Sequence, residues 1–207
     1  MAIIILTIIA LGFVFSDVVM ELDYSVANWI GQFRTNSGVG LFNLLTKLGS
    51  SFFVLFLSLV LSYFLWTLPL SGTSYLRVFW FTFLSSAATG YFFKYFIGRD
   101  RPLGAELYES SYSFPSGHAL TSLFFYGFIS FIIFRFSKLS GNKKYAIIFC
   151  FMSLILLIGA SRLYLGVHYI SDVVGGYLIG WFWLNTALYF MKDIQRERKL
   201  NVVKVSS

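Results

Sequence analysis

The first feature of the chain is a series of long apolar runs separated by short polar segments. A helix needs about 20 apolar residues, within a range of roughly 17 to 25, to cross the hydrocarbon core of a bilayer. The uncharged or apolar runs near that length are Ala2–Phe15, Ser51–Leu70, Val78–Phe93, Gly117–Phe134, Tyr145–Ser161 and Val173–Met191. The pattern predicts an all-α integral membrane bundle of six transmembrane helices, formed as a single domain over residues 1–207.

The N-terminal run is the weakest of the six, because Asp17 follows it closely. No basic residue precedes the run, and no small-residue cleavage site follows it, whereas a secretory signal peptide has both. We therefore interpret Ala2–Phe15 as a retained membrane segment.

Between the first two runs, over residues 22–48, apolar residues recur at helical spacing in two clusters. The first cluster is Leu22, Val26, Trp29, Ile30 and Phe33, and the second is Leu41, Leu44, Leu45 and Leu48. Gly38 and Gly40 interrupt the pattern between them. This spacing predicts short amphipathic helices at the membrane interface. They either cover the bundle, which is the simpler interpretation, or help a lipid head group reach a site, and periodicity alone does not distinguish the two.

Composition agrees with a chain that is solvated by lipid. Hydrophobic residues make up 57% of the chain and charged residues 12%, whereas a soluble domain has about 25% charged residues. The net charge is +7, but the cations lie largely in loops and in the tail, so the positive-inside rule explains them more simply than nucleic-acid binding does. The only cysteine, Cys150, can form no intrachain disulfide, and no cysteine metal site is possible.

The distribution of charge predicts an orientation. The segment Arg135–Lys144 and the tail from Lys192 to the end are rich in Lys and Arg, so we expect both on the cytoplasmic side. Six crossings then place three segments on the other side: Ser16–Ser50, Lys94–Pro115 and Ser161–Asp172. The outward segments also receive seven of the nine carboxylates. The basic residues found among them need a different explanation.

Three short patterns in or beside the last two outward segments contain the residues that can carry chemistry. They are Lys94-x6-Arg101-Pro102, Pro115-Ser116-Gly117-His118 and Ser161-Arg162-x5-His168-x3-Asp172. The chain has only two histidines, and both lie inside these patterns.

The spacing of His168 and Asp172 predicts that they share one face at the start of a helix. An aspartate that accepts a hydrogen bond from Nδ1 leaves the lone pair of Nε2 available, which is the arrangement of a nucleophilic histidine and the group that orients it. The alternative is an ordinary i,i+4 pair that holds a loop to a helix.

The sequence Pro115-Ser116-Gly117-His118 is typical of a helix start, with Ser116 as the N-cap. The first N–H groups of a helix have no internal partner and attract anions, and Gly117 allows an oxyanion to approach the backbone. His118 would stand at that anion site, where it could protonate a leaving oxygen. A helix start with a structurally satisfied histidine is the more common outcome for such a tetrapeptide taken alone.

Lys94, Arg101 and Arg162 are cations at the edge of hydrocarbon, on the side where the positive-inside rule does not favour them. Charges at membrane depth are costly and indicate function by default, and guanidinium groups match phosphate oxygens in a bidentate manner. The alternative is that such side chains extend to the lipid head groups. For Arg77 and Arg99, which lie outside the patterns, we favour that alternative.

Together the patterns resemble the tripartite signature of the type 2 phosphatidic acid phosphatase superfamily, with agreement at all eleven motif positions. The resemblance implies that His168 forms a phosphohistidine, that Asp172 orients it, and that His118 protonates the leaving alcohol. Either histidine would then help to activate the hydrolytic water. The resemblance also implies that the phosphate is held by Lys94, Arg101, Ser116, Gly117 and Arg162. The soluble branch of the superfamily binds vanadate and oxidises halides, and the membrane segments argue against that branch.

The predicted activity is hydrolysis of a phosphate from a lipid phosphate or diphosphate in the bacterial plasma membrane, with no cofactor. Small size resembles the bacterial enzymes that act on phosphatidylglycerophosphate, undecaprenyl diphosphate or phosphatidic acid, and the sequence does not select among these lipids. It does not indicate an oligomeric state either. Two alternatives remain. A phosphotransferase would pass the phosphate from the same histidine to an acceptor other than water, and an anion transporter would use the same cations, although no broken-helix repeat supports it.

The predicted mechanism requires no metal. Both histidines have other roles in it, and a site with two metal ions needs a cluster of carboxylate ligands. The remaining outward carboxylates are Asp17, Glu21, Asp23, Asp100, Glu106 and Glu109. Their spacing places no two on one helix face beside the motifs, except for Asp17 with Glu21.

Overall fold

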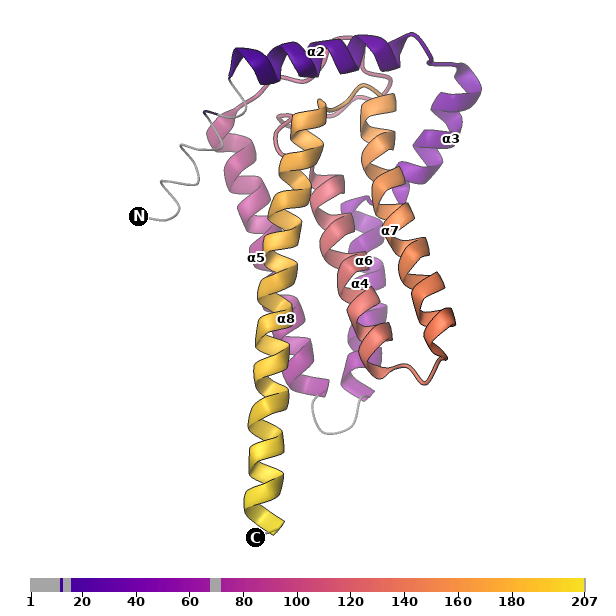
Figure 1. Ribbon diagram of the computed structural model, residues 1–207. Helices are drawn as coiled ribbons and strands as arrows, with labels where there is room; N and C mark the ends of the chain where they lie inside the picture. The colour runs from indigo at the N-terminus through magenta and orange to yellow at the C-terminus, as the bar shows by residue number, and fades with distance from the viewer. Residues whose placement is uncertain (1–11, 13–15, 68–71, 207) are drawn as a thin grey trace.

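The protein is helical, without strands, over the part of the chain that the structure describes. The computed structural model describes residues 12, 16–67 and 72–206, and its helices are α2 (Asp17–Gly31), α3 (Asn36–Lys47), α4 (Ser51–Thr67), α5 (Gly72–Ile97), α6 (Gly117–Phe136), α7 (Gly141–Tyr164) and α8 (Ile170–Ser206). Helices α4 to α8 run along one another, and α2 lies across one end of this bundle (Figure 1). The all-α prediction is confirmed for these residues.

Among the described residues, four helical stretches are long and apolar enough to cross a membrane. They are Asn36–Thr67, which joins α3 and α4, Gly117–Phe136, Gly141–Tyr164 and Ile170–Ile194. The expected crossing over Val78–Phe93 lies within α5, which is not one of the four, and serines, threonines and a glycine lower the hydropathy of this helix. The expected first crossing, over Ala2–Phe15, lies outside the described residues.

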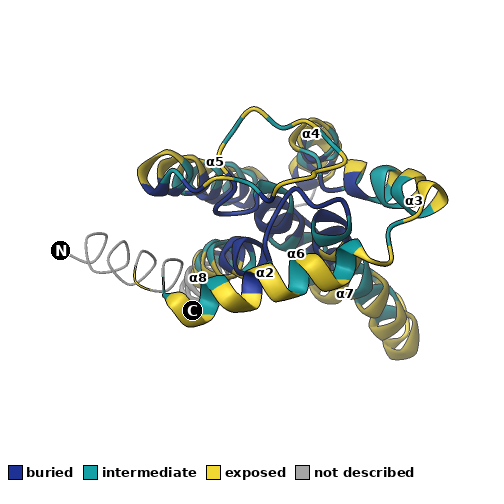
Figure 2. Ribbon diagram, turned by 90° about the horizontal axis from the view of Figure 1, so that it is seen from above, coloured by how far each residue is buried: buried dark blue, intermediate teal, exposed yellow. Residues whose placement is uncertain are grey.

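Helix α6 forms the centre of the bundle. It packs against α4, α5, α7 and α8, and the view from above shows buried residues gathered around it while the outer faces of the surrounding helices are exposed (Figure 2). Aromatic side chains fill the contact with α5, where the ring centroids of Phe79 and Phe128 are 4.9 Å apart. A helix that is apolar on all sides is what such a central position requires.

Helices α6 and α8 approach each other closely because α8 presents glycines to α6. A Cβ atom at Gly176 would lie 2.5 Å from the carbonyl oxygen of Ser116, and one at Gly180 would lie 2.7 Å from that of Leu120. No other residue fits at such distances, and small residues allow the backbones of membrane helices to approach in this way. The starts of the two helices are joined as well, since the N–H of Ser116 donates to the carbonyl oxygen of Asp172 at 2.9 Å.

The predicted amphipathic helices correspond to α2 and α3, but the predicted break between them was wrong. Gly38 and Gly40 lie inside α3, and the chain leaves helical geometry at residues 33–35 instead. Thr35 starts α3, because its hydroxyl accepts a hydrogen bond from the N–H of Gly38 at 3.1 Å. A Cβ atom at Gly38 would collide with the hydroxyl of Tyr164, so this glycine admits a side chain of α7 and does not end a helix.

The two ends of the bundle carry different segments. The α6–α7 connection and the C-terminus lie at the end opposite α2 (Figure 1). The basic loop and the basic tail therefore share one end of the molecule, as their charge predicted. The tail is not a separate segment, because α8 continues through it to Ser206.

Candidate active site

The three sequence patterns meet at the end of the bundle that α2 covers. Lys94 and Arg101 come from the last turn of α5 and the loop after it, Ser116, Gly117 and His118 from the start of α6, Arg162 from α7, and His168 and Asp172 from the α7–α8 connection and the start of α8. Positions far apart in the sequence come into contact here: Nη1 of Arg101 lies 3.3 Å from Nε2 of His168.

His168 is buried and lies beside the carboxylate of Asp172. The distance from its Nδ1 to Oδ2 of Asp172 is 3.5 Å, and the same Oδ2 accepts a hydrogen bond from the N–H of Tyr169 at 2.8 Å. Burial lowers the pKa of His168 to about 4, although the carboxylate of Asp172 opposes this shift. The imidazole is therefore neutral at neutral pH, which is the form that has a lone pair for attack on phosphorus.

The start of α6 has the geometry of an anion site. Ser116 is the N-cap, and its hydroxyl accepts from the N–H of Ala119 at 3.5 Å. A Cβ atom at Gly117 would meet no other atom within 4 Å, so the space beside the first helical N–H groups is open. His118 lies within electrostatic range of His168 and Arg162.

The predicted cations differ in how closely they approach His168. Arg101 donates to the carbonyl oxygens of Ser111 and Val167, each at 2.7 Å, which fixes its guanidinium beside Nε2 of His168. Lys94 donates to the carbonyl oxygen of Tyr112 at 2.5 Å, so its ammonium lies against the loop after α5.

Arg162 is fully buried and is held from α3. Its Nη1 donates to the hydroxyl of Thr46 at 2.8 Å. Its Nη2 pairs with Glu109. The Nε atom has no hydrogen-bond partner among the described residues, so this guanidinium retains a donor.

Glu109 occupies the space between the two arginines, and the sequence analysis missed it. Its carboxylate pairs with Arg162 through one oxygen and with Arg101 through the other, the second at 3.4 Å. Burial raises the pKa of Glu109, but the nearby positive groups, Arg162 first and then Arg101, together hold this pKa below its usual range. An anionic carboxylate therefore lies between the guanidinium groups of Arg101 and Arg162. Glu109 has no partner at helical spacing, so periodicity could not identify it.

The prediction that Arg99 extends to lipid head groups is wrong. It is buried, with 8% of its surface exposed, and it pairs with Asp172 at 2.8 Å and with Asp23 of α2 at 2.6 Å. Burial opposes its charge, but the two carboxylates raise its pKa above the usual value. Arg77, to which the same expectation applied, is exposed and bonds within its own helix.

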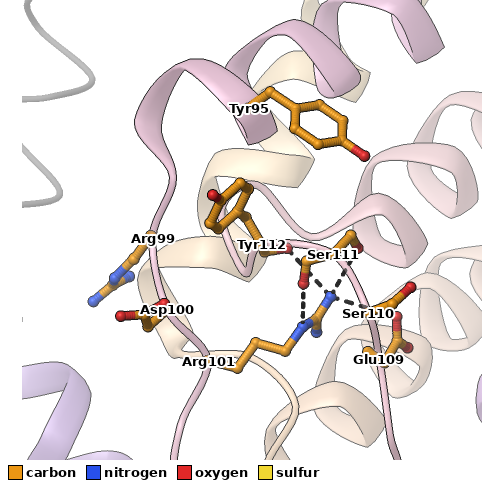
Figure 3. A pocket seen from close by; sticks show the side chains of 8 residues that line it. All are labelled: Tyr95, Arg99, Asp100, Arg101, Glu109, Ser110, Ser111 and Tyr112. Carbon is orange, nitrogen blue, oxygen red and sulfur yellow. Dashed lines mark hydrogen bonds and ion pairs between the residues drawn. The ribbon is translucent and has the colours of Figure 1, made fainter.

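A cavity of about 500 Å³ opens beside the Arg101 guanidinium (Figure 3). It is lined by Tyr95, Arg99, Asp100, Arg101, Glu109, Ser110, Ser111 and Tyr112. Arg101 links this cavity to His168, because its guanidinium lines the cavity and lies 3.3 Å from Nε2 of His168. The described residues contain no group of three His, Cys, Asp or Glu side chains that could hold a metal ion.

Comparison with known proteins identifies the family. Residues 53–196 match the model of the PAP2 superfamily, so the chain belongs to that superfamily, as its signature predicted. Over 108 residues it is 39% identical to phosphatidylglycerophosphatase B of Bacillus subtilis (strain 168). That match covers 51% of this chain and 53% of the relative, and so spans about half the length of the curated relative.

Two solved structures share the fold. The crystal structure of a transmembrane PAP2-type phosphatidylglycerolphosphate phosphatase from Bacillus subtilis superposes with a TM-score of 0.81 at 25% identity, covering 93% of this chain and 96% of that one. The crystal structure of LpxE from Aquifex aeolicus gives a TM-score of 0.59 at 24% identity, covering 83% and 95%, and supports the fold alone. With its four apolar helical stretches, this member of the superfamily is an integral membrane protein.

Proposed function

We propose that the protein is a membrane enzyme that removes a phosphate from a lipid phosphate or diphosphate, with His168 as the nucleophile. The observation that carries this proposal is the buried imidazole of His168, whose Nδ1 lies 3.5 Å from Asp172 and whose Nε2 lies 3.3 Å from Arg101. A nucleophile, its orienting carboxylate and an anion-binding cation are the parts that phosphoryl transfer requires.

The reaction would proceed in two steps. Nε2 of His168 attacks phosphorus, the bond from phosphorus to the lipid oxygen breaks, and His118 protonates the departing oxygen. Water then attacks the phosphorus of the phosphohistidine and gives its proton to His118, and the bond from phosphorus to Nε2 breaks, which releases phosphate and restores both histidines. Arg101, Arg162 and the open N-terminus of α6 would stabilise the charge of the transition state.

Binding of the substrate requires a change at Glu109. Its carboxylate pairs with both arginines in the free protein, and two anions cannot share these partners without repulsion. The phosphate would therefore replace the carboxylate on Arg162 and Arg101. The loop that carries Glu109 also lines the cavity, so this exchange would accompany the binding of the head group.

The proposal includes six crossings, with the active site outside the plasma membrane and the basic tail in the cytoplasm. The shared end of the basic loop and tail supports it. Impermeant thiol labelling of single cysteines at Ser111 and Asn142, in a Cys150→Ser background, tests the orientation. We expect labelling at position 111 in intact cells, and labelling at position 142 alone would reverse the orientation.

The function is tested by phosphate release from a panel of purified lipid phosphates, with His168→Ala as the control. Phosphatidylglycerophosphate belongs in the panel because both Bacillus relatives are named for it, together with undecaprenyl diphosphate and phosphatidic acid. Release by the unsubstituted protein and its loss in His168→Ala are the expected results. Turnover that appears only with an added alcohol acceptor would identify a phosphotransferase, and the lack of any turnover would favour an anion transporter.

The proposed mechanism is independent of metal ions. Activity in detergent should persist with excess chelator, and vanadate should inhibit, because it can adopt five-coordinate geometry with Nε2 of His168 as one apical ligand. Complete loss of activity in chelator with recovery on adding magnesium would exclude this mechanism.

A further inference from the structure

Two carboxylates, a hydroxyl group and an aromatic ring surround the guanidinium of Arg99. Its Nη1 donates to Oδ1 of Asp172 and to the hydroxyl of Ser171, and its Nη2 donates to Oδ2 of Asp23. The guanidinium also lies 4.3 Å from the ring centroid of Tyr169. Figure 3 shows its side chain extending away from the group formed by Arg101, Ser111 and Glu109. Arg99 therefore acts on the site through Asp172.

Asp23 connects α2 to the same network. It is 1% exposed, and it accepts from Nη2 of Arg99 at 2.6 Å, from the N–H of Ser171 at 3.0 Å and from the hydroxyl of Ser171 at 2.6 Å. All three donors lie outside α2. A carboxylate buried this deeply is stable only with such partners, so Asp23 ties α2 to the start of α8, beside the contact between the rings of Tyr24 and Tyr169.

Asp23 and Asp172 share the donors of Arg99, and this sharing determines which oxygen of Asp172 is left for other partners. Arginine often binds a carboxylate through two parallel hydrogen bonds, which here would engage both oxygens of Asp172. Because Asp23 binds Nη2, Arg99 gives Asp172 only Nη1, at Oδ1. The other oxygen, Oδ2, accepts from the N–H of Tyr169 at 2.8 Å and lies 3.5 Å from Nδ1 of His168, which has no other hydrogen-bond partner among the described residues.

We propose that Arg99 and Asp23 are positioning residues for the phosphatase reaction. Asp23 of α2 binds Nη2 of Arg99, so Arg99 binds only one oxygen of Asp172, and the other oxygen stays available to Nδ1 of His168. This inference rests on the proposed function of His168. It gives α2 a part in the proposed active site. The simpler interpretation of its sequence was that α2 only covers the bundle. Removal of a residue that positions a directly acting group typically lowers activity by about 10- to 100-fold.

The test compares kcat and KM for the lipid phosphate in Asp23→Asn, Arg99→Lys and Arg99→Ala, in detergent. We expect kcat to fall about 10-fold in Asp23→Asn and about 100-fold in Arg99→Ala. KM should stay within about twofold in each, because the proposal has both residues act through Asp172 and not by holding the phosphate. Ethylguanidinium should restore part of the kcat of Arg99→Ala. The controls are Glu21→Ala and Arg77→Ala, which remove an exposed charge from α2 and from α5 and should match the unsubstituted protein.

Two further measurements separate positioning from a purely structural role. The midpoint of thermal unfolding identifies a variant that fails to fold. Arg99→Ala leaves two buried carboxylates without their cation and is the variant most at risk of that failure, so Asp23→Asn and Arg99→Lys carry the test without it. Adding Asp23→Asn to Arg99→Ala should lower kcat little further, because Asp23 acts through Arg99.

Unchanged kcat in folded Asp23→Asn and Arg99→Lys would overturn the inference, and so would a rise in KM at constant kcat. In either case the unsubstituted protein would still release phosphate, so the proposed function would stand. If the unsubstituted protein and the controls release no phosphate from any lipid, the proposed function fails, and this inference fails with it.

Discussion

The two ends of the bundle hold their basic side chains in opposite ways. At the end opposite α2, the ammonium of Lys144 donates to the carbonyl oxygen of Phe134 at 3.0 Å and lies 5.8 Å from the ring centroid of that residue. Its partners are the end of a helix and an aromatic face. At the end that α2 covers, Arg99 and Arg162 are buried and pair with carboxylates.

This difference teaches how to separate cations that orient a membrane protein from cations that act in it. Both kinds lie just beyond apolar runs, and both look alike in the sequence. A cation that satisfies a helix end or a head group needs no carboxylate. A cation that is buried at the membrane edge needs one, since the cost of its burial must be offset by a partner. The acidic partners distinguish the active end.

The largest expected effect comes from Asp172→Asn. The side chain keeps its shape, but an amide can donate to the imidazole and favour the wrong tautomer of His168, so kcat should fall by about 10⁴-fold, by analogy with serine proteases. Phosphate release from a lipid phosphate measures the effect, and thermal unfolding checks the fold. A loss of less than tenfold would show that the carboxylate does not orient the nucleophile.

Arg162→Lys should have the next largest effect. Lysine keeps the charge but cannot bind Thr46 and still offer a planar pair of donors to a phosphate, as the guanidinium can. We expect kcat/KM to fall by about 10²- to 10³-fold, the scale of losing one donor to a transition-state oxyanion. Lys144→Arg provides the matched control at the opposite end. Equal activity in the two variants would remove the contrast between the ends.

The pH dependence should report the buried imidazole. A lowered pKa means that His168 loses its lone pair only in acid. For a pKa of about 4, the acid limb of kcat/KM that reports His168 should therefore lie near pH 4, with a fall of about tenfold per pH unit below it. The charged groups that act on this imidazole are Asp172, Arg162 and Arg101. An acid limb near the ordinary histidine pKa of about 6.5 would show that His168 is solvated.

Glu109→Gln should strengthen anion binding. The carboxylate competes with phosphate for Arg162 and Arg101, and a competing state reduces the apparent affinity by the fraction of time that it is occupied. Neutralising it should lower the inhibition constant for vanadate by about tenfold, which corresponds to about 1.4 kcal/mol. Inhibition assays on the two proteins under identical salt conditions measure the change. Weaker inhibition in the variant would mean that Glu109 helps to bind the anion.

The smallest effect is expected for Lys144→Ala. Because this side chain lies at the end opposite the site, kcat and KM should change by less than about twofold. The same phosphate-release assay is the measurement. A clear loss of activity would show that the two ends are coupled, and the comparison between them would lose its meaning.

The sequence predicted the helices and the convergence of the three patterns because both follow from local rules. Apolar length identifies crossings, and alternation across the membrane puts successive loops on defined sides. The partners of the predicted residues were not predictable in this way. Asp23 meets Arg99 across 76 positions and Thr46 meets Arg162 across 116, and no periodicity links residues so far apart. The break between α2 and α3 was misjudged for a related reason, since Gly38 leaves room for the side chain of Tyr164 on another helix.

The glycine seam between α6 and α8 has a consequence for how the protein responds to its surroundings. Lipid tails are as apolar as the helices, so the hydrophobic effect does not press two helices together inside a bilayer. The distance between the starts of α6 and α8 is therefore set by direct contact at Gly176 and Gly180, and bilayer thickness or lipid composition has little influence on it. A membrane whose lipids change with growth conditions would leave the spacing between the starts of α6 and α8 intact.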